Sequence, residues 1–244
     1  MSSLYLDLDL DPHLVSVGGT ASLVGAEARH AAVVNRVRVG EIIAVGNGRG
    51  LTVRGPAVEV SPELVTFSIT DMQSHEAARP GIWLVQALAK GGRDESAVQA
   101  ACELGIDGVI PWSAQRSIVK WERSKVQKGQ ERWSAIVREA SKQSIRSFLP
   151  EVAPLVTTKQ LALLAASTRM LVLSPDASAK LTAVTPDERD LVVVVGPEGG
   201  VSHGEISLLV AAGAEAVRLG DTVLRTGTAG PAAISALNVI LGRW

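Results

Sequence analysis

Two glycine-containing segments near the C-terminal end of the chain have residue types that could hold a small ligand. The first follows the apolar run Leu191–Val195 and reads Gly196-Pro-Glu-Gly-Gly200. The second, 217–230, places glycines and threonines around Arg225. An apolar strand that ends in glycines and restarts as a helix is how α/β proteins form a pocket at strand carboxyl ends. We therefore expect one shared pocket that binds its ligand mainly through backbone groups.

The first segment matches neither of two common phosphate-binding motifs. No Gly-Lys-Ser/Thr follows it, as a Walker A loop requires, and it lacks the G-x-G-x-x-G spacing of dinucleotide-binding proteins. The segment could bind a ligand through exposed backbone groups and one carboxylate, that of Glu198. Taken alone, the loop is also compatible with a tight strand-to-helix turn that binds nothing.

Other polar residues give weaker signals of chemistry. Ser202-His-Gly-Glu205 is a capping-box pattern, so we expect Glu205 to cap a helix and His203 to be an exposed residue of its first turn. The other histidines are scattered, Cys102 is the only cysteine, and G-x-S-x-G is absent. No metal site, disulfide or serine or cysteine nucleophile is expected.

A basic segment could contact phosphates. From Arg116 to Arg146 it has six more basic than acidic residues, in a chain of net charge −1. A solvated helix face balanced by acids elsewhere is the alternative. Its tryptophans could stack on bases. Trp133 is the exception, because it lies on the apolar stripe of the expected helix and is expected to be in the core. Gln143 and Arg146, one helical turn apart, could reach RNA together or line a dimer interface.

Alternating strands and helices position these residues. From residue 82 onward, apolar strand candidates at 82–88, 108–111, 170–173, 191–195 and 216–219 alternate with helices at 95–104, 124–147 and from Pro231. This order predicts an α/β fold with a parallel sheet that is covered on both faces.

The first 70 residues are different and look rich in β-structure. Residues 65–70 alternate as a half-buried strand does, 42–45 and 58–60 are short apolar runs, and 27–37 fits a short helix. A polar stretch, 73–81, ends in Pro-Gly and marks the boundary. We therefore predict two domains, 1–74 and 80–244.

Composition excludes several classes of protein. The chain has 244 residues, of which 46% are hydrophobic, so it can bury a core. A near-neutral charge means that any RNA site must be a local patch. The lone cysteine fits a reducing cytosol, and neither a signal peptide nor a membrane span is evident, so we expect a cytoplasmic protein.

Five motifs in order resemble a known family. They are Arg29-His30…Arg36-Val-Arg38…Gly40-Glu41; Lys90-Gly91 with Glu103…Asp107…Arg116-Ser117; Arg132-Trp133…Gln143-Ser144…Arg146…Pro150; Gly196–Gly200; and Leu219-Gly…Val223-Leu-Arg-Thr226…Thr228-Ala229. Together they resemble the bacterial 16S ribosomal RNA (uridine-N3) methyltransferases of the SPOUT superfamily.

The resemblance implies a fold, a cofactor and partners. The fold would be an N-terminal PUA-like β-barrel, which binds RNA, followed by a SPOUT α/β domain with a C-terminal trefoil knot. The cofactor would be S-adenosyl-L-methionine, and the substrate one uridine of 16S rRNA in the small ribosomal subunit. The protein would act as a homodimer, without a membrane.

The resemblance also assigns residues. Cofactor-binding candidates are Leu173, Ser174, Gly196, Pro197, Glu198, Gly199, Gly200, Leu219, Gly220, Val223, Leu224, Arg225, Thr226, Thr228 and Ala229. RNA-binding candidates are Arg29, Arg36, Arg38, Lys90, Arg116, Lys120, Arg132, Gln143 and Arg146.

The chain departs from the family pattern in two places. Gly227 stands where the family usually has a glutamate between two threonines, and the first strand, Leu4-Tyr-Leu-Asp7, lacks a common arginine. These differences put a role of that carboxylate, and RNA contacts from that strand, in doubt. Glu198 could replace the missing acid.

The chemistry of uracil N3 suggests roles for two side chains. Loss of the N3 proton leaves negative charge on the flanking carbonyl oxygens, which a fixed cation such as Arg225 could stabilise. Glu198 could accept the proton or orient the substrate. The alternative for Arg225 is an ion pair within its loop.

Three other functions remain open. One is methylation of ribose 2′-oxygens by a SPOUT enzyme. Another is a non-catalytic RNA-binding protein of the same fold, which Gly227 mildly favours. The third is a nucleotide-binding regulator, against which the missing Walker lysine argues.

Overall fold

The computed structural model describes residues 4–244, and the chain divides into two compact units. The N-terminal unit comprises residues up to 77 together with 141–149, and the C-terminal unit comprises 78–140 with 150–244. The prediction placed the boundary between residues 74 and 80 and assigned segment 141–149 to the C-terminal domain, whereas in the structure this segment belongs to the N-terminal unit. Residues 1–3, which contribute to the expectation of no signal peptide, lie outside the described part.

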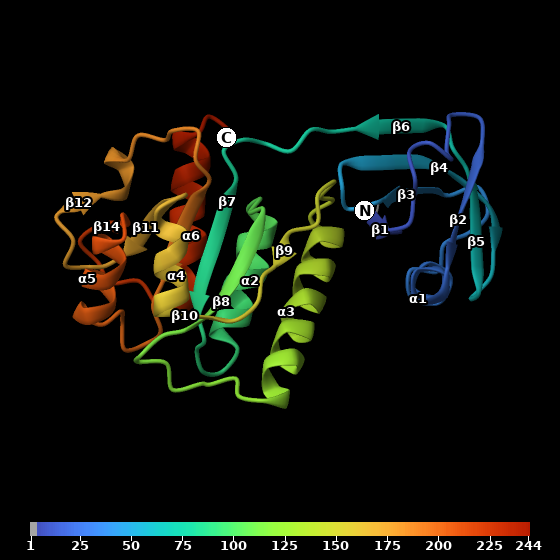
Figure 1. Ribbon diagram of the computed structural model, residues 1–244. Coiled ribbons are helices and arrows are strands. Elements are labelled where there is room, and N and C mark those ends of the chain that lie inside the picture. Colours follow the sequence, from blue (N-terminus) through green and yellow to red (C-terminus); the bar gives the residue numbers. More distant parts are fainter. Residues whose placement is uncertain (1–3) are drawn as a thin grey trace. The chain divides into compact units, whose positions relative to one another are not determined.

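The C-terminal unit is built on a parallel sheet of eight strands (Figure 1). The order is β10 (Val156–Thr157), β8 (Gly108–Ser113), β7 (Ile82–Ala87), β13 (Leu191–Val195), β11 (Arg169–Leu173), β14 (Glu215–Arg218) and β12 (Ala179–Lys180), and β9 (Glu151–Val152) also pairs with β8. Every pairing is parallel. All five residues of β13 are buried, as in a strand covered on both sides.

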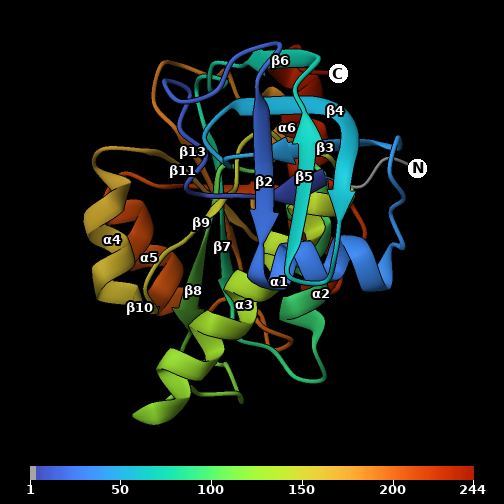
Figure 2. The same ribbon diagram turned by 90° about the vertical axis from the view of Figure 1, so that its right-hand side faces the viewer.

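Helices cover both faces of this sheet, as the alternation predicted (Figure 2). On one face lie α2 (Arg93–Glu103) and α6 (Thr226–Ile240), which pack against each other and against β7 and β13. On the other lie α4 (Thr158–Ala165) and α5 (His203–Ala211), whose Leu161 and Leu209 join a core with Val85 and Val194. A 3₁₀ turn, η2 (Leu181–Ala183), packs against α6.

The N-terminal unit is a mixed six-stranded sheet. Its order is β1 (Leu4–Leu6), β3 (Ile42–Gly46), β4 (Leu51–Val60), β5 (Leu64–Ser68) and β2 (Thr20–Val24), with β6 (Asp71–Ser74) on β4; α1 (Gly25–Arg29) and a π-helix, η1 (His30–Val34), lie between β2 and β3. β4 passes from β3 to β5 with a register shift after Ala57. At Gly55 a Cβ would lie 1.6 Å from the Ser68 carbonyl oxygen, so only glycine fits there. All side chains of β1 are buried, so this strand offers core contacts rather than an RNA surface.

Helix α3 (Ser124–Gln143) ends four residues earlier than predicted. Ile145 has a φ of +54°, and the Arg146 amide donates to the Ser141 carbonyl at 3.0 Å, which closes the helix end. The prediction that Gln143 and Arg146 share one helix face is therefore wrong. Lys142, predicted as part of the basic segment, is buried and pairs with Glu27 of the same unit at 3.3 Å.

The predicted capping box is confirmed at the start of α5. Ser202 accepts from the Glu205 amide, and Glu205 Oε2 accepts from the Ser202 amide at 3.1 Å. Glu205 Oε1 also accepts from the Gln115 amide at 2.8 Å and the Thr158 hydroxyl at 2.9 Å. The carboxylate therefore connects the start of α5 to the loop after β8 and to α4.

We expect Glu205→Ala to lower the free energy of unfolding by about 2–3 kcal/mol, because buried donors lose their acceptor. Ser202→Ala removes only the cap and should cost about 1 kcal/mol. Urea denaturation of both variants measures the difference. An equal or smaller loss for Glu205→Ala would contradict the connecting role.

None of the helices within residues 4–244 is both long and apolar enough to span a bilayer.

Candidate active site

A cavity of about 580 Å³ opens at the carboxyl ends of three adjacent strands of the C-terminal unit. Residues that follow β11, β13 and β14 line it, together with the start of α6. Because the three strands are parallel, their carboxyl ends meet at one edge of the sheet, which is where open α/β sheets bind ligands. The two glycine segments thus share one cavity.

The cavity brings together all but one of the predicted cofactor-binding residues. Leu173 and Ser174, the loop Gly196–Gly200, Leu219 and Gly220, and the residues Val223, Leu224, Arg225, Thr226 and Ala229 line it. Thr228 does not: it is an exposed residue of the first turn of α6. Thr226 and Ala229, three residues apart, share the helix face that meets the cavity, while Thr228 points elsewhere. Binding by these residues stays a prediction.

The predicted start of the last helix at Pro231 is wrong, because α6 begins at Thr226. Glycines and threonines in this first turn have low intrinsic helix propensity, which hides the helix from sequence reading. Tertiary contacts stabilise it: the Thr226 hydroxyl donates to the Gly196 carbonyl at 2.7 Å, and a Cβ at Gly227 would lie 3.1 Å from the Arg93 carbonyl. The amino end of α6 therefore adjoins the cavity.

The loop after β13 is folded tightly on itself. A Cβ at Gly196 would lie 2.8 Å from Val201 Cγ2 and 2.9 Å from the Val201 amide nitrogen. Gly200 has a φ of +70°, a conformation that glycine adopts without strain. The Arg116 guanidinium donates to the Gly199 carbonyl at 2.9 Å. These contacts fix the shape of the loop that lines the cavity.

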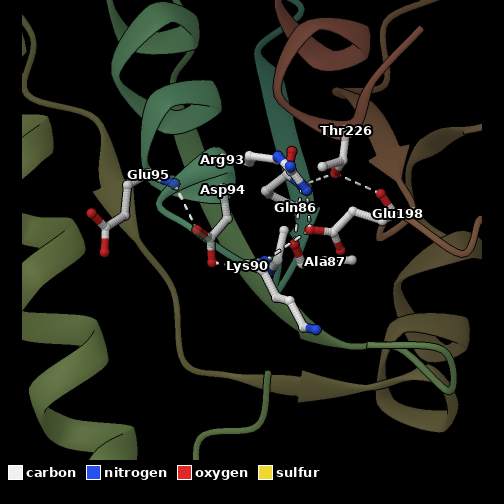
Figure 3. Close-up of polar contacts among 10 residues, drawn as sticks. Gln86, Ala87, Lys90, Arg93, Asp94, Glu95, Glu198 and Thr226 are labelled. Carbon is white, nitrogen blue, oxygen red and sulfur yellow. Dashed lines mark hydrogen bonds and ion pairs between the residues drawn. The ribbon is translucent and has the colours of Figure 1, made fainter. Parts of the chain in front are cut away.

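Glu198 is anchored at the cavity by residues more than a hundred positions earlier in the chain (Figure 3). Its Oε1 accepts from the Lys90 amide and the Arg93 guanidinium, each at 2.9 Å. Burial opposes ionisation of the carboxyl, but its own amide, the Lys90 amide and the Arg93 guanidinium together hold its pKa below the ordinary value. A carboxylate with a lowered pKa is a weak base, so the structure favours orientation over proton acceptance.

Glu198→Gln is expected to lower the melting temperature at neutral pH but not in acid. Because the folded-state pKa lies below the ordinary 4.5, the carboxylate stabilises the fold above that pH. This contribution is lost as the pH falls through the folded-state pKa. Melting temperatures from about pH 7 to about pH 3 measure it, with Glu188→Gln, an exposed glutamate of the same unit, as the control. A difference that stays constant with pH would contradict the ion pair.

Arg225 is the N-cap residue of α6, lines the cavity and is exposed. Within residues 4–244 its side chain forms no hydrogen bond or ion pair, so the alternative of an ion pair within the loop does not hold. By contrast, Arg218 in the same wall pairs with Asp221 at 2.7 Å. Arg225 is therefore a cation available to a bound molecule.

Comparison with known proteins identifies the family. Residues 76–238 match the model of the RNA methyltransferase domain. The chain belongs to this RNA methyltransferase family. The ribosomal RNA small subunit methyltransferase E of Mycobacterium tuberculosis is 37% identical over 95% of this chain and 90% of its own length, and that of Bacillus subtilis is 28% identical over 95% and 94%.

A solved structure of a relative has the same fold. The ribosomal RNA small subunit methyltransferase E from Neisseria gonorrhoeae, bound to S-adenosyl methionine, aligns with a TM-score of 0.87 and 29% identity over 98% of both chains. The alignment covers both units of this RNA methyltransferase.

The structure separates the predicted RNA-binding residues of this RNA methyltransferase into two groups. Arg29, Arg36, Arg38, Gln143 and Arg146 belong to the N-terminal unit, and Lys90, Arg116, Lys120 and Arg132 to the C-terminal unit. Only Arg116 lines the cavity. Arg132 pairs with Glu95 at 2.5 Å, so part of the basic segment is balanced by an acid from α2, as the alternative held. RNA binding by these residues stays a prediction.

The tryptophans of the basic segment mostly belong to the core. Trp112 and Trp133 are fully buried, which confirms Trp133 as a core residue and makes Trp112 unsuitable for stacking on a base. Trp121 is partly exposed and packs edge-to-face on Trp133, with ring centroids 5.4 Å apart.

The prediction missed several cavity residues of this RNA methyltransferase. Arg93, Asp176, His203 and Arg218 also line it. His203 is exposed in the first turn of α5, as expected, but it also faces the cavity. Arg93 follows the Lys90-Gly91 motif by two residues, and Asp176 follows Leu173-Ser174 by two. Their position next to these motifs could have indicated from the sequence that they line the cavity. Within the described chain, no group of three or more His, Cys, Asp or Glu side chains could hold a metal ion.

Proposed function

We propose that the protein transfers a methyl group from S-adenosyl-L-methionine to N3 of a uridine in 16S rRNA. The observation that carries the proposal is the cavity formed by two glycine segments at one sheet edge, in a chain of the RNA methyltransferase family. Relatives along nearly the whole chain are methyltransferases of ribosomal small-subunit RNA, and one is bound to S-adenosyl methionine.

The size and the lining of the cavity suit S-adenosyl-L-methionine. A volume of about 580 Å³ lies within the usual range of small-molecule pockets, roughly 300–1,000 Å³. Gly196 is in a tight fold that a Cβ would disturb, so a side chain there would displace the loop that lines the cavity. We expect Leu173, Leu219 and Leu224 to contact the apolar part of the cofactor and backbone groups of Gly196–Gly200 to bind its polar edges.

The chain would contribute positioning and electrostatics. When bound, S-adenosyl-L-methionine supplies a methyl group on a positively charged sulfur. The glycine segments would hold the two reactants in line, which is the largest contribution expected of the protein. Arg225 would stabilise the negative charge that develops on the uracil oxygens. Glu198, fixed by Arg93, would orient the base or cofactor.

The cation-rich wall of the cavity suits an RNA substrate. Arg93, Arg116, Arg218 and Arg225 line it, against Asp176 and Glu198 as the acids. Such a local excess attracts a polyanion even though the whole chain is nearly neutral. The uridine would have to leave its base pair to enter the cavity.

The remaining features of the family are part of the same proposal. The bent sheet of the N-terminal unit would act as a PUA-like, RNA-binding barrel. The contact between α6 and η2 is compatible with a C-terminal trefoil knot. A homodimer acting on the small ribosomal subunit in the cytoplasm would complete the functional assembly.

The decisive experiment measures methyl transfer from labelled S-adenosyl-L-methionine to small ribosomal subunits from cells that lack this gene. Mass spectrometry of the product nucleosides should find 3-methyluridine. A 2′-O-methylated nucleoside would instead support the ribose methyltransferase. Cofactor binding without transfer, on intact subunits, would support the non-catalytic RNA-binding protein.

A further inference from the structure

Gln86 is a fully buried polar residue behind the cavity. It lies at the carboxyl end of β7, next to the last residue of the strand, and does not line the cavity. Side chains alternate along a strand, so Gln86 shares a sheet face with Leu84. Leu84 lies against α6, because a Cβ at Gly230 would be 3.0 Å from its Cδ1. Gln86 therefore points toward the start of the same helix.

A chain of hydrogen bonds runs from Gln86 to the first glycine segment (Figure 3). Gln86 Nε2 donates to the Ala87 carbonyl at 3.0 Å and to Thr226 Oγ1 at 2.9 Å. The Thr226 hydroxyl in turn donates to the Gly196 carbonyl at 2.7 Å. Thr226 and Gly196 both line the cavity.

The direction of these bonds is fixed by the available donors and acceptors. The Ala87 carbonyl can only accept, so the amide NH₂ must face it, and both of its N–H groups are then used. Thr226 has one hydroxyl proton, and since its oxygen accepts from Gln86, that proton goes to Gly196. Gln86 thus occupies the acceptor side of the Thr226 oxygen and leaves its proton to the Gly196 carbonyl.

One polar atom of this arrangement is left unpaired. Within the described residues, Gln86 Oε1 is buried and has no hydrogen-bond partner. A buried polar atom without a partner is unfavourable, and an apolar side chain of the same length would avoid it. A residue kept for stability alone would not leave an acceptor unpaired.

We propose that Gln86 is a positioning residue, which holds the Gly196 loop and the amino end of α6 at the separation that the cofactor requires. This inference rests on the proposed function. Gln86 itself does not touch the cofactor: it acts through Thr226, by directing the hydroxyl that ties the two glycine segments together.

The test is Gln86→Met, which keeps the length of the side chain but cannot donate. We expect its melting temperature to equal or exceed that of the wild type. Its dissociation constant for S-adenosyl-L-methionine, measured by calorimetry on the full chain, should rise about tenfold, or about 1.4 kcal/mol. In methyl transfer the KM for the cofactor should rise similarly, with kcat nearly unchanged.

A double-variant comparison separates positioning from general damage. Thr226→Val breaks the chain of bonds, and combining it with Gln86→Met should weaken binding little beyond either single change. Additive losses, or wild-type affinity in folded Gln86→Met, would overturn the proposal.

Gln86→Glu provides a second route if the methionine variant does not fold. Burial raises the pKa of the new carboxyl, and only its protonated form can donate to Thr226. Its affinity for the cofactor should therefore recover as the pH falls from about 8 to about 6, relative to the wild type. An affinity with the same pH dependence as the wild type would overturn the proposal. Failure of the proposed function would give a different result from failure of the proposal for Gln86: the wild type itself would then neither bind the cofactor nor transfer a methyl group.

Discussion

Gly196→Ala is expected to lower the affinity for S-adenosyl-L-methionine at least tenfold. The added Cβ would lie 2.9 Å from the Val201 amide nitrogen and 2.8 Å from its Cγ2. Backbone cannot give way as a flexible side chain does, so the loop itself must shift. Because the Gly196 carbonyl also accepts from Thr226, a shift separates the two glycine segments. Calorimetric titration with the cofactor measures the effect.

Gly204→Ala is the matched control for this substitution. Gly204 lies in the first turn of α5, and a Cβ built there has no atom within 4 Å. It should bind the cofactor as the wild type does and be slightly more stable, because alanine favours a helix over glycine by about 1 kcal/mol. Wild-type affinity in folded Gly196→Ala would mean that the loop does not form the cofactor site.

Arg225→Ala should lower kcat for methyl transfer by about 100- to 1,000-fold, the usual loss when one group that stabilises developing charge is removed. The side chain lines the cavity and has no partner among the described residues, so its loss breaks no ion pair of the fold. Stability should be nearly unchanged. Single-turnover methylation of small subunits, at saturating cofactor, isolates the chemical step.

Two further variants show whether the loss in Arg225→Ala is specific to this side chain. Arg225→Lys keeps the charge but loses the planar fork, so an intermediate rate is expected. Arg218→Ala removes another cavity arginine that is already paired with Asp221, and it should affect kcat far less. If both alanine variants lose rate equally, the effect is general attraction of RNA rather than stabilisation of the reacting base.

The segment that follows β7 holds Glu198 at the cavity. Lys90 and Arg93 hold Glu198, and Asp94 fixes their loop by accepting from the Ala89 amide at 3.2 Å. Burial raises the pKa of Asp94, although the Ala89 and Glu95 amides that donate to its carboxylate act in the opposite direction. Lys90 was predicted to contact RNA, and this stays a prediction. In the structure, its backbone supports the first glycine segment.

Local sequence determined the elements and their order. The buried run Leu191–Val195 is a strand because β-branched residues pack well in a sheet covered on both faces. The capping box from Ser202 to Glu205 starts α5 because its hydrogen bonds lie within four residues. Because loops at the carboxyl ends of parallel strands meet at one edge of a sheet, the two glycine segments could be placed in one pocket from the sequence alone, although β11 lies between their strands.

Tertiary structure decided what depends on contacts far apart in the chain. Helix α6 begins at Thr226 and not at Pro231, because the Thr226 hydroxyl donates to the distant Gly196 carbonyl and so stabilises a turn whose own residues disfavour helix. Residues 141–149 belong to the N-terminal unit, where Lys142 pairs with Glu27, although 115 positions separate them. Glu198 is oriented by Arg93, 105 positions away. Propensity and spacing describe only neighbours in sequence, so such partners, and the roles they fix, were decided by the packing of the folded chain.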